Sequence, residues 1–245
     1  MAIRVAAILA CCAGLNCTAA FAQWNPGITA SLGQGLGSIA LSQSVLSGTR
    51  LIGQSSVGRG GVAAATPHAP ATATLTYVTE PRVSDRVRGA MIDVLSKQNP
   101  ELRPKIARAF ANDEVLRNFD RFMRSRGWSS HDIADDMAML LLVGWETVTS
   151  RDATAAQIEG ARRQLHGVFR QTPQLRAMTN ADRQVLGEQI AYEVVITSLV
   201  RQQAVRSGDR AQLAQLRQST ATLIKQQGVD LTRLTLTDRG FSAAS

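Results

Sequence analysis

A histidine and three aspartates lie close together at residues 131–136. His131 and Asp135 are four residues apart, so a helix there would place both side chains on one face. An imidazole and a carboxylate at that spacing suit a divalent ion, but a metal site needs at least three ligands, each oriented by hydrogen bonds of its own. Acidic side chains in the first turn of a helix also offset its dipole without a metal. We therefore assign these residues a structural role, keep His131 and Asp135 as the metal candidates, and expect no cofactor.

Glutamates form a second set of residues that could do chemistry. Glu146 follows a long apolar segment, residues 137–145, and is the acid whose pKa burial would raise most. Two carboxylates facing each other across a cleft hydrolyse glycosides, so Glu146 with Glu188, Glu193 or Asp135 would suit a muramidase-like envelope hydrolase. Against this, the aromatic side chains that commonly line sugar subsites are scarce: the chain has three tryptophans and two tyrosines. A buried glutamate paired with an arginine explains the same pattern, so hydrolysis through Glu146 and Glu188 is the alternative function.

Other catalytic chemistries lack their motifs. The sequence contains no G-x-S-x-G for serine hydrolysis and no G-x-x-x-x-G-K-[ST] loop for nucleotide phosphates. Its cysteines are Cys11, Cys12 and Cys17, which all lie within the first 22 residues. A chain that has lost those residues has no thiol nucleophile, no disulfide and no thiolate metal site.

Arginine accounts for most of the basic residues, which suits binding to an acidic partner. The chain carries 27 basic and 19 acidic side chains, a formal charge of +8. Arginine binds carboxylates and phosphates through two parallel hydrogen bonds and keeps its charge. We expect an envelope protein or an anionic envelope polymer as partner, and no nucleic acid, because aromatic residues are not interleaved with the basic ones. Solvated helix faces explain the same charges. The candidate binding residues form a local basic patch: Arg162, Arg163, Arg170 and Arg176.

The first 22 residues have the pattern of a secretory signal peptide. Arg4 precedes an apolar, alanine-rich stretch, residues 5–20, and Ala20-Phe21-Ala22 offers small residues at both positions that a signal peptidase reads. The stretch is too short and too polar to span a bilayer, and no later segment is longer, so we expect no membrane-spanning helix. The protein is therefore predicted to be periplasmic or secreted after cleavage near Ala22. Lipoprotein processing at Cys11 is a minor alternative.

Residues 23–79 differ in composition from the C-terminal two thirds of the chain. They contain no acidic residue, two basic ones, and many glycines, serines, alanines and threonines. Such a segment buries too little apolar surface to offset the entropy of ordering it, so we predict a flexible low-complexity segment. Within it, residues 72–78 alternate threonine with apolar side chains, which predicts one short strand.

Residues 80–245 form the predicted folded domain, because their apolar side chains recur at helical spacing. The expected fold is all-α, a compact bundle of about six or seven helices, and no segment after Val78 is expected to form a strand. The helix carrying Trp145 is apolar nearly all round and should be the central, most buried one. Asp152 or Thr154 is expected to begin the following helix. Two pairs have the spacing of a capping box, Ser129 with Asp132 and Thr179 with Asp182.

Several short motifs of the C-terminal half occur together in one known group of proteins. They are Asp132-Ile-Ala-Asp135 before the leucine-rich helix with Trp145, Asp182-Arg-Gln184 with Glu188, Gly228-Val-Asp-Leu231, and Leu236-Thr-Asp-Arg-Gly-Phe241. In these motifs the chain resembles an uncharacterised family of exported bacterial all-α proteins, over about residues 85–241. The resemblance implies a fold and a compartment and no catalytic residue.

These patterns together predict a non-enzymatic binding or structural protein of the bacterial cell envelope. The helical domain would supply a rigid surface, and the low-complexity segment would supply reach.

Overall fold

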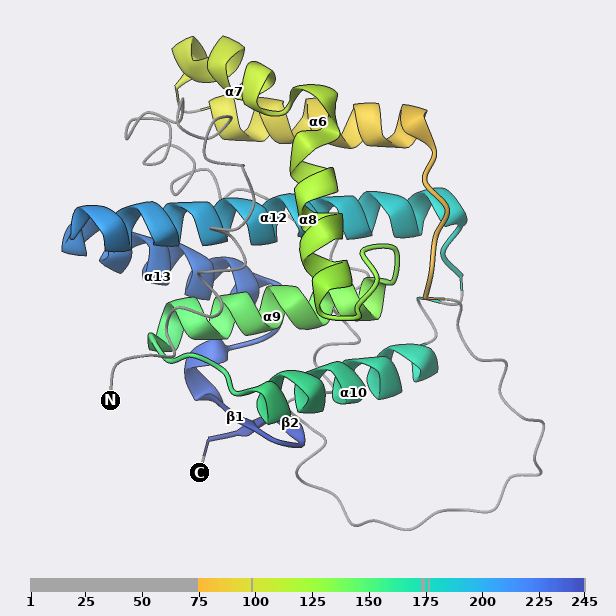
Figure 1. The fold of residues 1–245 in the computed structure, drawn as a ribbon, viewed down its shortest axis with the longest axis vertical. Coiled ribbons are helices and arrows are strands. Elements are labelled where there is room, and N and C mark those ends of the chain that lie inside the picture. The colour runs from red at the N-terminus through yellow and green to blue at the C-terminus, as the bar shows by residue number, and fades with distance from the viewer. Residues whose placement is uncertain (1–74, 98, 173–174, 176, 245) are drawn as a thin grey trace.

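Seven α-helices make up most of the described chain, which in this computed structural model comprises residues 75–97, 99–172, 175 and 177–244 (Figure 1). The predicted all-α bundle of six or seven helices is confirmed. The predicted signal peptide and most of the low-complexity segment lie outside the described residues. The α-helices are α6 (Pro81–Ser96), α7 (Arg103–Ala109), α8 (Glu114–Ser125), α9 (Ile133–Thr149), α10 (Ala155–Gln171), α12 (Asn180–Ser207) and α13 (Arg210–Gln226). Short 3-10 turns occupy Pro100–Leu102, Ala111–Asp113 and Leu231–Arg233.

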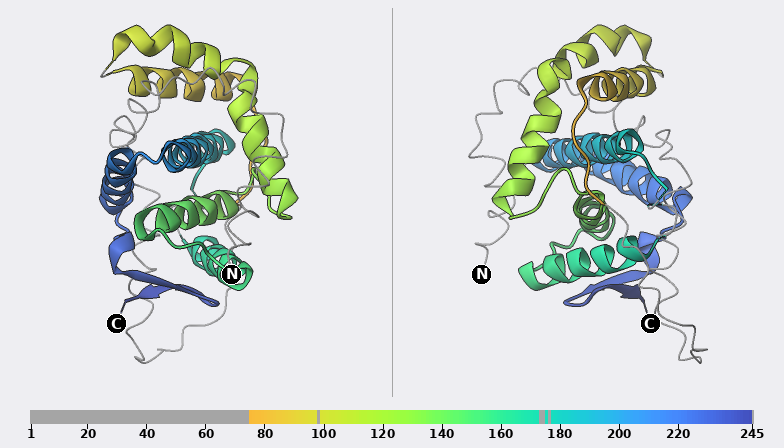
Figure 2. Two further views of the ribbon diagram at one scale, coloured as in Figure 1. Left: turned by 60° about the vertical axis from the view of Figure 1, so that its left-hand side comes forward. Right: turned by 90° about the vertical axis from the view of Figure 1, so that its right-hand side faces the viewer.

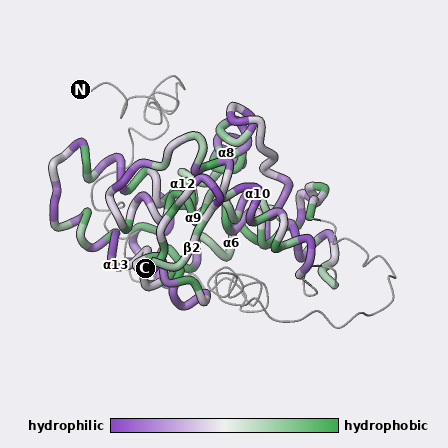
Figure 3. The backbone as a smooth tube through the Cα atoms, turned by 90° about the horizontal axis from the view of Figure 1, so that it is seen from below, coloured by the Kyte–Doolittle hydropathy of each residue, from purple (hydrophilic) through white to green (hydrophobic). Residues whose placement is uncertain are grey.

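Helix α9 lies at the centre of the molecule, as its apolar sequence predicts. Nearly all of its side chains are buried, and it packs against α10, α12 and α13. Hydrophobic residues gather along α9 and α12, and hydrophilic ones lie on the outer helices (Figure 3). A helix that is apolar all round must be covered on every side, which fixes α9 as the element around which the others assemble.

The helices form layers on either side of α9. Helices α6, α12, α9 and α10 lie one below the other, and α8 crosses them steeply (Figures 1 and 2). One hydrophobic core surrounds α9, and a second fills the space between α12 and the α6–α8 segment. Since α12 lies between the two cores, it buries side chains on more than one face.

An extended segment, residues 75–80, precedes α6 and is called the strap here. It crosses the N-terminal ends of α9 and α12, and Thr76 forms an isolated antiparallel bridge with Asp132. Leu75 and Tyr77 are buried. The short strand predicted for residues 72–78 is therefore present as one bridge within the described residues, and the packed body begins at least five residues before Glu80.

A β-hairpin after α13 corrects the expectation that no strand follows Val78. Strands β1 (Leu234–Thr237) and β2 (Gly240–Ala243) pair antiparallel, with Leu236 opposite Phe241. The outer edge of β2 is capped by a side chain: the Gln164 amide accepts from the Phe241 N–H at 2.7 Å and donates to its carbonyl at 2.8 Å. Strand β1, Leu-Thr-Leu-Thr, does alternate, but over only four residues, the lower limit of that signal, and the side chain that caps β2 comes from a distant helix.

Gly160 allows the hairpin to pack directly on α10, and replacing Gly160 should weaken this packing. A Cβ at Gly160 would run into the carbonyl oxygen of Asp238, whereas a Cβ at Gly167 of the same helix meets nothing within 4 Å. We expect Gly160→Ala to lower the free energy of unfolding by about 1–3 kcal/mol. Gly167→Ala should raise it by about 0.5–1 kcal/mol, because alanine favours the helix. Urea denaturation of both variants measures the difference, and equal effects would contradict the seating of the hairpin.

Candidate functional site

His131 and Asp135, the metal candidates, point to different partners. His131 shares hydrogen bonds with Thr79 Oγ1 (3.0 Å, from Nε2) and Ser130 Oγ (3.2 Å, from Nδ1). Asp135 is directed toward α10, where it meets Arg162 and His166. Within the described residues, no group of three histidine, cysteine or acidic side chains could hold a metal ion. The structure assigns neither residue as a metal ligand.

Asp135 is the centre of a buried ion pair that fastens α10 to α9. Arg162 donates to both of its oxygens, at 2.7 and 3.0 Å, His166 lies 2.7 Å away, and the Ser129 N–H donates at 2.9 Å. Burial acts to raise the pKa of Asp135, but the hydrogen bonds from His166, Arg162 and Ser129 outweigh it and hold this pKa below its usual value. The Arg162 guanidinium also lies over the Trp128 ring, 5.1 Å from its centre. This network is an anchor between two helices.

The candidate binding arginines are therefore not equivalent. Arg162 is committed to Asp135, and Arg176 lies outside the described residues. Arg163 and Arg170 are exposed on α10, and neither has a carboxylate partner among the described residues, although Arg163 donates to the carbonyl of Asp238 at 3.2 Å. Two of the four arginines remain available to a partner molecule.

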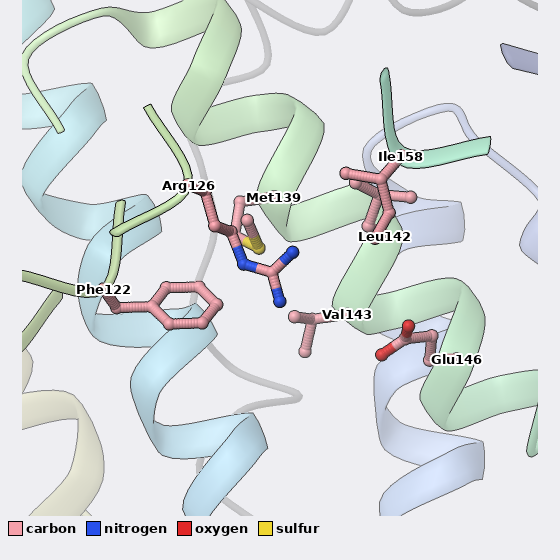
Figure 4. A pocket seen from close by; sticks show the side chains of 7 residues that line it. All are labelled: Phe122, Arg126, Met139, Leu142, Val143, Glu146 and Ile158. Atoms are coloured by element: carbon pink, nitrogen blue, oxygen red, sulfur yellow. The ribbon is translucent and has the colours of Figure 1, made fainter. Parts of the chain in front are cut away.

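Glu146 is sealed against groups of its own chain. Its carboxylate accepts from the Ala153 N–H at 3.0 Å and lies 3.5 Å from Arg201. Burial raises the pKa of Glu146, and the Ala153 N–H and Arg201 offset part of that rise. It lines a cavity of about 30 Å³, toward which Arg126 extends (Figure 4). That volume holds a water molecule or two and no sugar ring. The other residues lining the cavity are Phe122, Met139, Leu142, Val143 and Ile158.

Glu188, the second carboxylate of the alternative function, lies far from Glu146. It accepts hydrogen bonds from Ser84 Oγ (2.6 Å) and Gln184 Nε2 (2.8 Å), while burial raises its pKa. Helices α9 and α12 run in the same direction: Asp136 lies beside Gly187 near their starts, and Glu146 beside Arg201 near their ends. Ten residues of helix separate the two levels, about 15 Å. Paired glycosidase carboxylates lie roughly 5–10 Å apart, so this geometry does not bring the two together.

Two buried acids of the central helices were not singled out as isolated groups from the sequence. Asp136 and Glu193 are fully buried, and none of their carboxylate oxygens has a hydrogen-bond partner among the described residues. Burial raises the pKa of both well above their ordinary values, and Asp132 and Asp135 add to the effect at Asp136. Such carboxyls are held in their protonated form, at a cost in stability. The sequence signal that could have identified them is an acidic residue within an otherwise apolar helix face.

Comparison with known proteins identifies the family of the chain. A family model described as "Family of unknown function (DUF6683)" matches residues 3–244, a longer stretch than the resemblance over residues 85–241 covers. The match agrees with the resemblance to an uncharacterised family. No curated protein and no solved structure matches the chain.

Proposed function

The chain belongs to the DUF6683 family of unknown function, and we propose that it is an exported protein of the bacterial cell envelope that acts by binding. Export is supported by the first 22 residues, with Arg4, an apolar stretch and the small residues Ala20 and Ala22. In the described part of the chain, no helix combines the length and apolar character needed to cross a bilayer.

One observation carries the binding function: most acids of the helical body are hydrogen-bonded or buried, whereas a set of arginines is exposed and has no carboxylate partner among the described residues. On α10, Arg163 and Arg170 are exposed and seven residues apart, about 10 Å along one face. Glu159, the acid of this helix, accepts a hydrogen bond from the Trp128 indole N–H at 3.2 Å, and among the described residues it forms no ion pair with either arginine. The face therefore offers cations to an acidic surface, as an anionic envelope polymer or an acidic envelope protein presents.

Crosslinking in the cells that make the protein tests this proposal. A C-terminally tagged full-length chain carries a photo-crosslinking residue at the exposed Ala156 of α10, two turns before Arg163, and captured molecules are identified by mass spectrometry. We expect one dominant envelope component, lost in the double variant Arg163→Gln, Arg170→Gln. The matched control is Arg210→Gln, Arg217→Gln on α13, an exposed pair with the same spacing and no carboxylate partner among the described residues. Loss in the α13 variant alone, or no captured component, would contradict the assignment to α10.

Two further variants test whether the low-complexity segment takes part in binding and whether the protein is instead a hydrolase. Deletion of residues 23–74 removes most of the low-complexity segment and keeps the strap, so a weaker crosslink in this variant assigns the deleted part a role in binding. The double substitution Glu146→Gln, Glu188→Gln should leave the crosslink unchanged. If it abolishes a peptidoglycan-cleaving activity of the purified protein, the protein is a hydrolase and the binding proposal fails.

A further inference from the structure

The strap is held in its seat as an added β-strand would be. On one side, the Tyr77 N–H donates to the His131 carbonyl at 3.0 Å, and the Ile133 N–H donates to the Leu75 carbonyl at 3.1 Å. On the other side, the partners are side chains of α12. All of these are hydrogen bonds of the strap backbone, and water can take their place where the strap leaves.

Two amide side chains of α12 take the place of a neighbouring strand. Asn180 accepts from the Val78 N–H at 2.8 Å and donates to its carbonyl at 2.9 Å. Gln184, one helical turn later, does the same for Glu80, at 2.8 and 3.0 Å. The helical spacing of four thus matches the strand spacing of two. Strap position therefore depends on its backbone and on the buried side chains of Leu75 and Tyr77.

Beneath Tyr77 lies the unpartnered carboxyl of Asp136. Gly187 brings the two together: a Cβ there would lie 2.7 Å from the Tyr77 hydroxyl and 2.8 Å from Asp136 Oδ2. The Tyr77 hydroxyl already donates to the Ser130 carbonyl, at 2.8 Å. The seated strap thus covers an acid without giving it a donor, and Asp136 is 0% exposed.

We propose that the strap is a proton-controlled latch, seated while Asp136 carries its proton and released when Asp136 ionises. An ionised carboxylate here needs water or a donor, and departure of Tyr77 is what admits water. Burial raises the pKa of Asp136, and because the strap covers Asp136, its release would bring this pKa back toward its ordinary value. The seated state therefore holds a proton that the released state lacks, so seating is favoured at acid pH and weakens as the pH rises.

Other charged groups face this seat from each element around it. Arg183 is the cation, and it is engaged with the carbonyls of Thr76 and Met178. Glu188 is hydrogen-bonded to Ser84 and Gln184. Most of the rest are acids, whose negative charge disfavours ionisation of Asp136. These groups are Asp132 at the N-cap of α9, Asp135 on α9, Asp120 on α8, His131 in the preceding loop, Tyr77 and Glu80 on the strap, and Arg183 and Glu188 on α12.

Amide hydrogen exchange of the protein, read at single residues by NMR between pH 5 and 8, tests the latch. The protection factors of the Tyr77, Val78 and Glu80 amides should fall with rising pH, by up to tenfold per pH unit while Asp136 titrates. The chemical shift of the Asp136 carboxyl carbon in wild-type protein should titrate over the same pH range in which the strap loses protection. This readout needs no variant.

Three isosteric variants identify the group responsible. In Asp136→Asn, strap protection should no longer depend on pH. Glu193→Gln removes an equally buried acid that makes no hydrogen bond to the strap, so it should keep the wild-type dependence. Constant strap protection in wild-type protein, a pH dependence retained in Asp136→Asn, or its loss in Glu188→Gln would each overturn the proposal.

Discussion

Replacing Arg162 by glutamine is expected to lower the free energy of unfolding by about 3 kcal/mol at pH 7. The side chain of Asp135 is 2% exposed, and Arg162 supplies two of its hydrogen bonds. Without the guanidinium, a buried carboxylate keeps only His166 and the Ser129 N–H. Removing one partner of a buried ion pair is costly because the other charge stays buried.

The neighbouring arginine provides the control for this measurement. Arg163 is exposed and makes one hydrogen bond, to the Asp238 carbonyl, so Arg163→Gln should change the stability by less than about 0.5 kcal/mol. Urea denaturation at pH 7 compares the two. If Arg162→Gln is as mild as Arg163→Gln, then Asp135 is not held as described.

The pH dependence gives the same ion pair a second signature. Because the pKa of Asp135 is held below its ordinary value, its contribution to stability is present above pH 4, roughly, and is lost as the pH falls through the folded-state pKa. In Arg162→Gln this acid-side loss should shrink, since the folded-state pKa moves back up. Stability curves from pH 2 to 7 would show whether it does.

Local patterns predicted the helical part of the fold well. The box of Thr179 and Asp182 caps α12 as its spacing predicts, and Thr154 caps α10. Each cap forms between residues that lie within four positions of one another, so the sequence alone is enough to predict it. The box expected at Ser129 was wrong, because Asp132 itself caps α9 through the N–H groups of Ala134 and Asp135. Ser129 and Asp132 are both residue types that cap helices. The bridge between Asp132 and Thr76 of the strap favours the cap at Asp132.

Contacts between distant segments could not be predicted from one sequence. Asn180 and Gln184 are ordinary polar residues of a helix until the strap, about 100 residues earlier, lies beside them. Asp135 and Asp136 show how finely such contacts depend on geometry. One residue is a rotation of about 100° on a helix, which turns Asp135 toward Arg162 and Asp136 toward Gly187. Sequence spacing grouped the two acids, whereas the fold gives them opposite electrostatics.

Glu193→Met is expected to raise the free energy of unfolding by about 1–3 kcal/mol at pH 4, and by more than that at pH 7. Glu193 is 0% exposed and neither carboxylate oxygen has a partner among the described residues. A buried polar group without hydrogen bonds costs about 1–3 kcal/mol, and an unbranched apolar chain of similar length removes that cost. Burial raises the pKa of Glu193, so keeping it protonated at neutral pH adds to the cost.

The pH dependence separates these two contributions to the instability caused by Glu193. Its folded-state pKa lies above its unfolded value of about 4.3, so stability is greatest below that pH and falls by up to about 1.4 kcal/mol per pH unit until the folded-state pKa is reached. Neither Glu193→Met nor Glu193→Gln can ionise, so both should lose this slope, but the glutamine keeps its polar atoms buried and should gain less. Denaturant unfolding from pH 4 to 8 measures all three proteins. A wild-type protein more stable than Glu193→Met throughout would mean that the carboxyl has a partner in the folded protein.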